Sequence, residues 1–285
     1  MSYILFNGEL SKRETISIDI EDRGYQFGDG IYEVVRVYNG RLFTWKEHID
    51  RLYASAEKIR MTIPYTKEEM KDFMDKLIEK NELTEGTIYL QLTRGVAPRN
   101  HAFPGSDVQA TFVAYTKVSE RPVQLMEKGV DAHLVEDKRW LYCDIKSLNL
   151  LGNVLAHQEA LDAGCYEAIL LRDGVVTEGS HTNVSIISNG VVYTHPANNL
   201  ILNGISRKVM MKACKSKSIS FKEEAFTVDQ LMKADEAFIT STTLEITPIC
   251  KINGLPVGIE GQYNVIRQLQ DAFVAEIEAE CGPLQ

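Results

Sequence analysis

One lysine of the sequence has surroundings that suit a nucleophile. Lys146 lies in "WLYCDIKSLNLLGN", after a strand-like run and before the small and apolar start of a helix. A lysine among apolar groups loses solvation of its ammonium, so its pKa falls and the neutral amine can form a Schiff base. A single lysine is more often a surface residue. Lys146 is therefore a candidate nucleophile that needs support from other residues.

A carboxylate further along the chain could provide that support. Glu178 follows a strand-like run in "LLRDGVVTEGSHTNVSII" and precedes a glycine and small hydroxyl residues. Its ordinary interpretation is a carboxylate in a turn. Alternatively, a carboxylate that faces a pyridine nitrogen keeps the ring protonated and able to withdraw electrons. Enzymes that use pyridoxal phosphate need such a group besides the lysine.

Several donors could hold the phosphate of such a cofactor. In "ILNGISRKVMMKA" a turn leads into a helix, so Ile205 and Ser206 would present free backbone N–H groups at its N-terminus. Ser241 and Thr242 in "ITSTTLEITP" add hydroxyl and amide donors, and Arg51 could bind a phosphate with two N–H groups. Taken singly, these residues also suit a helix cap or a solvated surface.

A second anion site is indicated by "LTRGVAPRNHAFP". Arg99 and His101 lie two positions apart on a turn that follows a strand-like run. Loops on rigid scaffolds often carry binding residues, and these two side chains could receive a small anion.

The first part of the chain is predicted to be rich in strands. Asn39-Gly40 separates two β-rich arms in "YEVVRVYNGRLFTW", which is typical of a hairpin. Helical spacing follows in "WKEHIDRLYASAEKI", and "TKEEMKDFMDKLIEK" begins with Thr66 and Glu69 as a capping box. The polar segment "TKVSERP" indicates a linker, so we expect two domains, 1–120 and 121–285.

The second part alternates strands and helices, which favours an α/β fold. Strands are predicted in "GVDAHLVE" and "EAFITST", hairpins in "EAILLRDGVVTEG" and "VSIISNGVVYTH", and helices in "NLLGNVLAHQEALDAG", "SRKVMMKACKSK" and about 262–280. The lysine would then belong to the C-terminal domain.

Composition limits the class of protein. The 285 residues are 44% hydrophobic and 25% charged, as in an ordinary globular protein, and no apolar run is long enough to cross a membrane. The net charge of -9 opposes a nucleic-acid-binding surface. The start lacks the pattern of a signal peptide, so we expect none, and the five cysteines are irregularly spaced without a metal-ligand pattern. We expect a cytoplasmic protein with reduced thiols and no metal.

Four motifs together resemble a known family. They are "DIKSLNLLGNVLAHQEA", "EGSHTNV", "THPANNLILNGISR" and "TSTTLEITP". In this order and spacing they are similar to the fold-type IV pyridoxal-phosphate aminotransferases, which include branched-chain aminotransferases, D-amino acid aminotransferases and aminodeoxychorismate lyase. The similarity extends from "FNGEL" to the last helix. It implies a two-domain fold with the cofactor, pyridoxal 5'-phosphate, at the domain interface, and a homodimer.

The resemblance assigns roles to individual residues. It implies that Lys146 forms the Schiff base and moves protons, and that Glu178 is the partner of the pyridine nitrogen. It places Leu202 behind the cofactor ring. The implied phosphate site consists of Arg51, Ile205, Ser206, Ser241 and Thr242. One departure is Ser185, because the family usually has an aromatic residue there.

Substrate handedness is implied by the loop after "TRG". Arg99 and His101 resemble the trap for the substrate carboxylate in D-amino acid aminotransferases, where a tyrosine that matches Tyr32 completes it. The implied reaction moves the amino group of a D-amino acid such as D-alanine to 2-oxoglutarate, giving pyruvate and D-glutamate. The alternatives are an L-branched-chain aminotransferase, a lyase of the aminodeoxychorismate type, and a non-catalytic anion-binding protein, which would have no use for Lys146 and Glu178.

Overall fold

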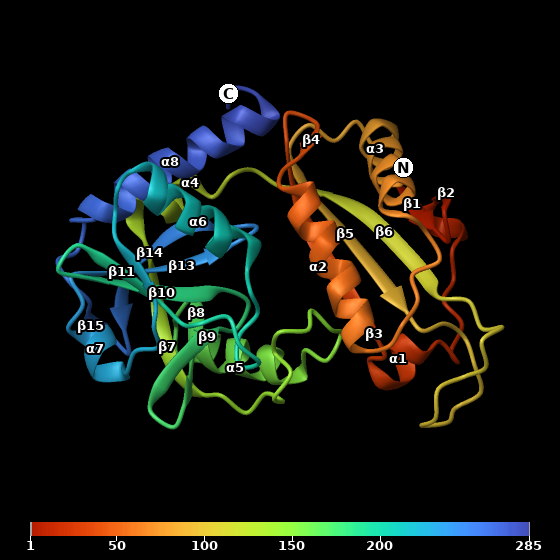
Figure 1. Ribbon diagram of the computed structural model, residues 1–285, viewed down its shortest axis with the longest axis horizontal. Helices are drawn as coiled ribbons and strands as arrows, with labels where there is room; N and C mark the ends of the chain where they lie inside the picture. The colour runs from red at the N-terminus through yellow and green to blue at the C-terminus, as the bar shows by residue number, and fades with distance from the viewer. Residues whose placement is uncertain (1, 285) are drawn as a thin grey trace. The chain divides into compact units, whose positions relative to one another are not determined.

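Strands rich in buried β-branched and aromatic residues form two separate sheets in the computed structural model, which describes residues 2–284 (Figure 1). Each sheet belongs to a unit with its own hydrophobic core. The first unit comprises residues up to Glu120, Ile145–Asn149 and residues from Glu280 onward, and the second comprises Arg121–Asp144 and Leu150–Ala279. The division after Glu120 falls in the polar segment "TKVSERP".

The first unit contains a six-stranded antiparallel sheet in the order β2-β1-β6-β5-β3-β4. Its strands are β1 (Tyr3–Phe6), β2 (Glu9–Lys12), β3 (Gly30–Tyr38), β4 (Arg41–Leu42), β5 (Gly86–Thr93) and β6 (Thr111–Val118). Asn39 and Gly40 have φ of 51° and 71° in the turn between β3 and β4. This is the backbone conformation that Asn-Gly hairpins require, and the hairpin prediction is confirmed.

The helices of the first unit supply the other half of its core. They are η1 (Arg13–Thr15), α1 (Arg23–Phe27), α2 (Trp45–Lys58) and α3 (Lys67–Lys80). The helical spacing read from the sequence is confirmed, because Ile49 and Leu52 of α2 and Met74 of α3 are buried in the same cluster as the sheet residues. Thr66 Oγ1 accepts the Glu69 N–H at 3.1 Å, and Glu69 Oε2 accepts the Thr66 N–H at 2.7 Å. The predicted capping box is therefore present.

The second unit contains a nine-stranded mixed sheet. Eight strands follow the order β12-β11-β10-β13-β14-β7-β8-β9, and β15 pairs with β14. Its strands are β7 (Val130–Glu136), β8 (Glu167–Arg172), β9 (Val175–Gly179), β10 (Asn183–Ser188), β11 (Val191–Thr194), β12 (Phe221–Glu223), β13 (Glu236–Ser241), β14 (Glu245–Ile252) and β15 (Leu255–Pro256). Strands β7 and β8 are parallel, so they need a crossover connection.

Helices of the second unit include this crossover. They are α4 (Val123–Lys128), α5 (Leu151–Asp162), α6 (Ile205–Ser216), α7 (Val228–Met232) and α8 (Asn264–Cys281), whose end from Glu280 onward belongs to the first unit. Helix α5 connects β7 to β8, and its Ala156 and Ala160 pack with Leu170 of β8. The α/β class predicted from the sequence is confirmed. No helix among residues 2–284 has both the length and the apolar character to span a membrane.

Strand β14, which contains Pro248, was not predicted from the sequence. In the structure Pro248 pairs with Phe238 of β13, whereas pairing with β7 begins only at Ile249. The missing N–H of the proline therefore removes no hydrogen bond from the ladder with β7.

The capping box gives a first testable prediction. Thr66→Ala removes the side-chain acceptor at the start of α3, so the free energy of unfolding should fall by about 1 kcal/mol. Urea denaturation followed by circular dichroism measures this change. Thr62→Ala is the matched control, since Thr62 is exposed and lies outside any helix, and it should change stability by less than about 0.5 kcal/mol. Equal effects of the two substitutions would contradict the capping role.

Candidate active site

The segment that carries Lys146 lies along the start of β3 in the first unit. Lys146 O accepts the Tyr32 N–H at 3.0 Å, and Leu148 N–H donates to Gly30 O at 3.0 Å. Ser147 forms an isolated bridge with Ile31. These backbone contacts attach the segment to the first sheet, although the sequence analysis placed Lys146 in the domain 121–285.

The Lys146 side chain lies close to an aromatic ring. Its Nζ is 4.4 Å from the centroid of the Tyr32 ring, and both residues are half-buried. The electron-rich face of a ring attracts a cationic amine. Two of the predicted site residues, far apart in the sequence, are thus neighbours.

A buried carboxylate organises the residues beside Tyr32. Glu33 of β3 is 1% exposed, and it accepts Arg51 Nε at 2.7 Å and Arg51 Nη2 at 2.9 Å. His48 Nδ1 lies 2.7 Å from Glu33 Oε2. Burial alone would raise the pKa of Glu33, but Arg51 and His48 together hold it well below its usual range. Arg51, predicted to bind phosphate, is therefore fixed by a charged partner that the sequence analysis missed.

His48 is neutral in this arrangement. Burial lowers the pKa of His48, and the opposing effect of Glu33 does not restore it. The neutral ring donates its Nδ1–H to Glu33, so one negative charge on Glu33 is balanced by one positive charge on Arg51. A glutamate in the otherwise apolar run "GIYEVV" was the signal that could have revealed this pair.

Arg99 and His101 lie on an exposed loop of the first unit. The Arg99 guanidinium is 4.4 Å from the centroid of the Phe27 ring, and the His101 ring is 5.5 Å from it. Arg23 lies over the same ring at 4.8 Å and donates to Asn100 O at 2.7 Å. Phe27 and Arg23 therefore hold the loop. In the part of the chain that the structure describes, no hydrogen bond or ring contact joins Arg99 to Tyr32.

Glu178 lies at the end of β9 in the second unit and is 5% exposed. Its Oε2 accepts the Leu202 N–H at 3.0 Å and Asn183 Nδ2 at 3.0 Å, and its Oε1 accepts Arg139 Nη1. All these neighbours are donors, as an ionised carboxylate requires. Burial nevertheless raises the pKa of Glu178 to about 7, although Arg139 and the Leu202 N–H oppose the rise. Glu178 thus titrates near neutrality and can share a proton with a pyridine nitrogen.

Arg139 was also missed from the sequence. It bridges Glu178 and Asp137, with Nε 2.9 Å from Asp137 Oδ1 and Nη2 2.8 Å from Asp137 Oδ2. Burial alone would lower the pKa of Arg139, but Asp137 and Glu178 raise it above its usual value. Arg139 lies in the charged run "EDKR", which gave no sign that it is buried.

The predicted phosphate seat is a helix terminus without a side-chain cap. Helix α6 begins at Ile205, its N-cap Gly204 provides no side-chain acceptor, and both Ile205 and Ser206 are buried. A Cβ at Gly204 would come 2.0 Å from Asn183 Oδ1, so only glycine fits. The first N–H groups of a helix lack internal partners and favour an anion. This donor set fits a phosphate group.

The other predicted contacts adjoin these elements. Ser241 ends β13, and its Oγ accepts the Leu244 N–H at 3.2 Å. Ser241 and Thr242 are half-buried. Asn183 pairs with Thr240 across β10 and β13, while its Nδ2 donates to Leu202 O at 2.9 Å. Within the second unit, Asn183 therefore connects Glu178, Leu202 and the end of β13.

Comparison with known proteins identifies the family. Residues 30–252 match the family described as "Amino-transferase class IV". The chain belongs to this family, and it is a pyridoxal-phosphate-dependent transaminase of fold type IV.

Individual relatives agree with this assignment. The chain is 51% identical to a protein named D-alanine aminotransferase from Listeria monocytogenes serotype 1/2a (strain 10403S), covering 99% of this chain and 98% of the relative. It is 50% identical to a D-alanine aminotransferase from Staphylococcus aureus (strain COL), covering 98% and 99%.

Solved structures show the same fold. The Escherichia coli branched-chain amino acid aminotransferase has a TM-score of 0.91 and 27% identity, covering 96% of this chain and 94% of the other. A second branched-chain amino acid aminotransferase, from T.th. and complexed with N-(5'-phosphopyridoxyl)-L-glutamate, has a TM-score of 0.90 and 26% identity, covering 99% and 94%.

The raised pKa of Glu178 leads to a prediction about stability. An ordinary glutamate has a pKa of 4.5, and burial raises that of Glu178 to about 7, so the folded state binds this proton more tightly than the unfolded state. The resulting stabilisation is complete below about pH 4.5 and is lost as the pH rises to about 7. In cofactor-free protein, Glu178→Gln should remove this loss, which amounts to about 3 kcal/mol.

Urea denaturation of both cofactor-free proteins between about pH 5 and pH 8 tests this expectation. Glu127→Gln, at an exposed position of α4, is the matched control and should keep the pH dependence of the wild type. Identical pH profiles for the wild type and Glu178→Gln would contradict the raised pKa.

Proposed function

We propose that this transaminase moves the amino group of a D-amino acid, D-alanine in particular, to 2-oxoglutarate, with pyruvate and D-glutamate as products. Its near full-length similarity to bacterial proteins named D-alanine aminotransferase carries the proposal. The pair Arg99 and His101 supports the same substrate class. The branched-chain aminotransferases share the fold at much lower identity, so an L-branched-chain substrate is the less favoured alternative.

Lys146 is the proposed catalytic residue. When bound, pyridoxal phosphate supplies a carbonyl carbon that an amine can attack and a ring that withdraws electrons. The Lys146 amine would hold the cofactor at this carbon, would give up that place to the amino group of the substrate, and would then accept the proton from the substrate's Cα. Contact with the Tyr32 ring supports the role, because it holds the amine in one place.

Glu178 is proposed to hold a proton on the ring nitrogen. Its Oε1 accepts from Arg139, and a carboxylate oxygen can accept a second donor. A pKa near 7 lets Glu178 share this proton at neutral pH. Arg139 and Asn183 act as positioning residues, since their hydrogen bonds fix the carboxylate.

The remaining residues are proposed to bind the phosphate and the ring. The N–H groups of Ile205 and Ser206 at the α6 terminus receive the phosphate, with the hydroxyls of Ser241 and Thr242 as further donors. Arg51 is a further proposed phosphate ligand, and its bidentate contact with Glu33 supports this role by fixing the guanidinium. Leu202 packs behind the ring.

The substrate carboxylate is assigned to Arg99, His101 and Tyr32. A guanidinium offers a planar set of donors that matches a carboxylate, and a histidine and a tyrosine hydroxyl can complete the site. The stacking of Arg99 on Phe27 supports the assignment, since it orients the guanidinium before substrate arrives. With the amino group and the carboxylate both fixed, only one hand of substrate directs its α-proton to Lys146.

A homodimer is also proposed, on the basis of an exposed apolar surface of the second unit. Leu151, Val154 and Leu155 of α5 are 72%, 59% and 62% exposed. Leu141 and Tyr142 are 55% and 59% exposed in the segment that leads toward α5. Large exposed apolar patches are typical of protein interfaces. We call these five residues the α5 patch.

A cytoplasmic location is proposed for the same protein. All five cysteines are free, and four of them are buried. Free thiols are typical of reducing compartments. The expected partners are amino acids and 2-oxo acids; the net charge of -9 supports the expectation that nucleic acid is not among them.

The function is tested by the response of the holoenzyme to the two enantiomers of alanine. D-alanine without an acceptor should bleach the visible band of the bound cofactor, and 2-oxoglutarate should restore it. L-alanine and L-leucine should leave the band unchanged, and borohydride should attach the pyridoxyl group to Lys146. Bleaching by L-leucine and not by D-alanine would favour the branched-chain alternative. Repeated release of pyruvate from aminodeoxychorismate without an amino acceptor would favour the lyase.

Arg99→Ala tests the carboxylate site. Loss of a charged, bidentate contact should lower kcat/KM for D-alanine by about 30-fold or more. A primary amine without a carboxylate should be affected far less. Arg41→Ala, at an exposed position of β4, is the matched control and should react as the wild type does. Equal losses for both substrates, or loss of bound cofactor, would assign Arg99 to the fold or to the phosphate.

Leu155→Glu tests the dimer. A charge within the α5 patch should shift the sedimentation coefficient from that of a dimer to that of a monomer, because an unpaired charge in an interface costs several kcal/mol. The matched control is Leu255→Glu in β15, since Leu255 has a similar exposure of 61%. A dimer that withstands Leu155→Glu but not Leu255→Glu would place the interface elsewhere.

A further inference from the structure

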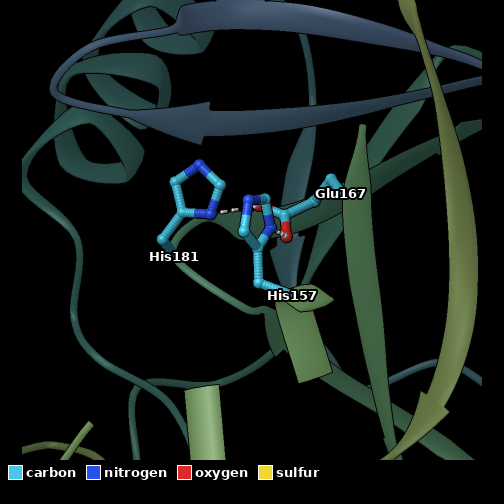
Figure 2. A group of neighbouring side chains, drawn as sticks. All are labelled: His157, Glu167 and His181. Carbon is cyan, nitrogen blue, oxygen red and sulfur yellow. Dashed lines mark ion pairs between the residues drawn. The ribbon is translucent and has the colours of Figure 1, made fainter. Parts of the chain in front are cut away.

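Two histidines and a glutamate converge in the second unit, outside the residues assigned above (Figure 2). His157 lies on α5, Glu167 begins β8, and His181 follows β9. Figure 2 shows both imidazole rings directed toward the Glu167 carboxylate. His181 Nδ1 is 3.0 Å from Glu167 Oε2, and His157 Nδ1 is 3.9 Å from Glu167 Oε1.

These distances suit a transition metal ion. Each residue offers one ligand atom, a ring nitrogen or a carboxylate oxygen, and these three atoms lie within 4.8 Å of one another. Bonds of about 2.0–2.2 Å in a tetrahedral site place ligand atoms roughly 3.3–3.6 Å apart. Small rotations of the two histidine side chains would therefore bring both ring nitrogens and the carboxylate to bonding distance.

Hydrogen bonds hold the carboxylate in place. One comes from the Ser180 hydroxyl, which donates to Glu167 Oε1. The same hydroxyl also lies 3.3 Å from His157 Nδ1 and 3.0 Å from His181 Nδ1, so a bound ion would replace its contacts with the two rings. Glu167 is completely buried, and its Oε1 accepts the Ala168 N–H at 2.7 Å and the Ser180 N–H at 3.1 Å. Thr182 Oγ1 donates to Oε2 at 3.0 Å. Hydrogen bonds from surrounding groups orient the ligands of metal sites in this way.

The cluster is open on the side of the histidines. The side chains of His157 and His181 are 35% and 43% exposed, whereas Glu167 has no exposed surface. Their rings meet edge to face with centroids 5.1 Å apart. An ion can therefore enter from solvent and keep a water molecule as its fourth ligand.

We propose that His157, Glu167 and His181 bind one divalent transition metal ion of the zinc class. Imidazole and carboxylate ligands suit zinc, and they bind as neutral ring and carboxylate. The bound ion ties α5 to the turn that begins at Gly179, directly after Glu178. Sequence spacing predicted no metal because the three ligands come from separate elements.

The test is calorimetric titration of chelator-treated holoenzyme with Zn²⁺ in a buffer that does not bind metal. One ion per chain should bind, and His157→Gln and His181→Gln should each weaken binding by at least about 100-fold, since losing even an outer hydrogen-bond partner of a ligand costs about 10–100-fold. There are two matched controls. His133→Gln changes another histidine of the same unit, and Cys165→Ser removes a half-buried thiol near Glu167 in the sequence.

The site is supported if both histidine variants bind Zn²⁺ more weakly while both control variants bind it as the wild type does. No binding to the wild type, or wild-type affinity in both histidine variants, overturns it, and so does loss of binding in Cys165→Ser alone. If a histidine variant fails to fold, the unmodified holoenzyme still decides the question. Zn²⁺ should then protect His157 and His181, but not His133, from diethyl pyrocarbonate, as read by mass spectrometry; equal modification with and without Zn²⁺ overturns the proposal.

Discussion

A buried carboxylate must be surrounded by donors, because an ionised group without partners is too costly in an apolar interior. This constraint applies in both units of the protein. Glu33 fixes Arg51 and His48, and Glu178 fixes Arg139 and the Leu202 N–H. Each carboxylate ties a strand to a helix or a loop, so the positions of the polar side chains follow from the need to satisfy these buried charges.

The two carboxylates nevertheless have opposite proton affinities. Glu33 gains more from Arg51 and His48 than it loses by burial, so its pKa falls. Glu178 shares Arg139 with Asp137, and burial outweighs the remaining attraction, so its pKa rises to about 7. The surroundings thus favour the ionised form of the same residue type at one position and raise its pKa to about 7 at the other.

The sequence predicted the local features of this molecule well. Helices α2 and α3, the capping box at Thr66 and the Asn39-Gly40 hairpin depend on neighbours in the chain, and all were confirmed. Partners distant in the sequence could not be predicted. The pairing of Glu33 with Arg51 depends on how α2 packs on β3, and neither residue type indicates its partner.

The residues of the candidate site divide in the same way, into those that a local motif indicates and those that only the fold brings together. Motifs identified Lys146 and Glu178 through their family resemblance, but not Arg139, which stands in an ordinary charged run and becomes buried only in the folded unit. Nor did they indicate that Phe27 and Arg23 support the Arg99 loop, since those contacts join α1 to a loop far along the chain.

The division of the chain between its two units has a consequence for synthesis on the ribosome. The first unit includes Ile145–Asn149, which adds to β3, and residues from Glu280 onward, whose Glu280 accepts the Thr44 N–H at 3.1 Å. Domains usually fold as they emerge, N-terminal first. Here the edge of β3 stays unpaired until Ile145–Asn149 has been made, and the contact between Thr44 and Glu280 cannot form until nearly all of the later unit has been made.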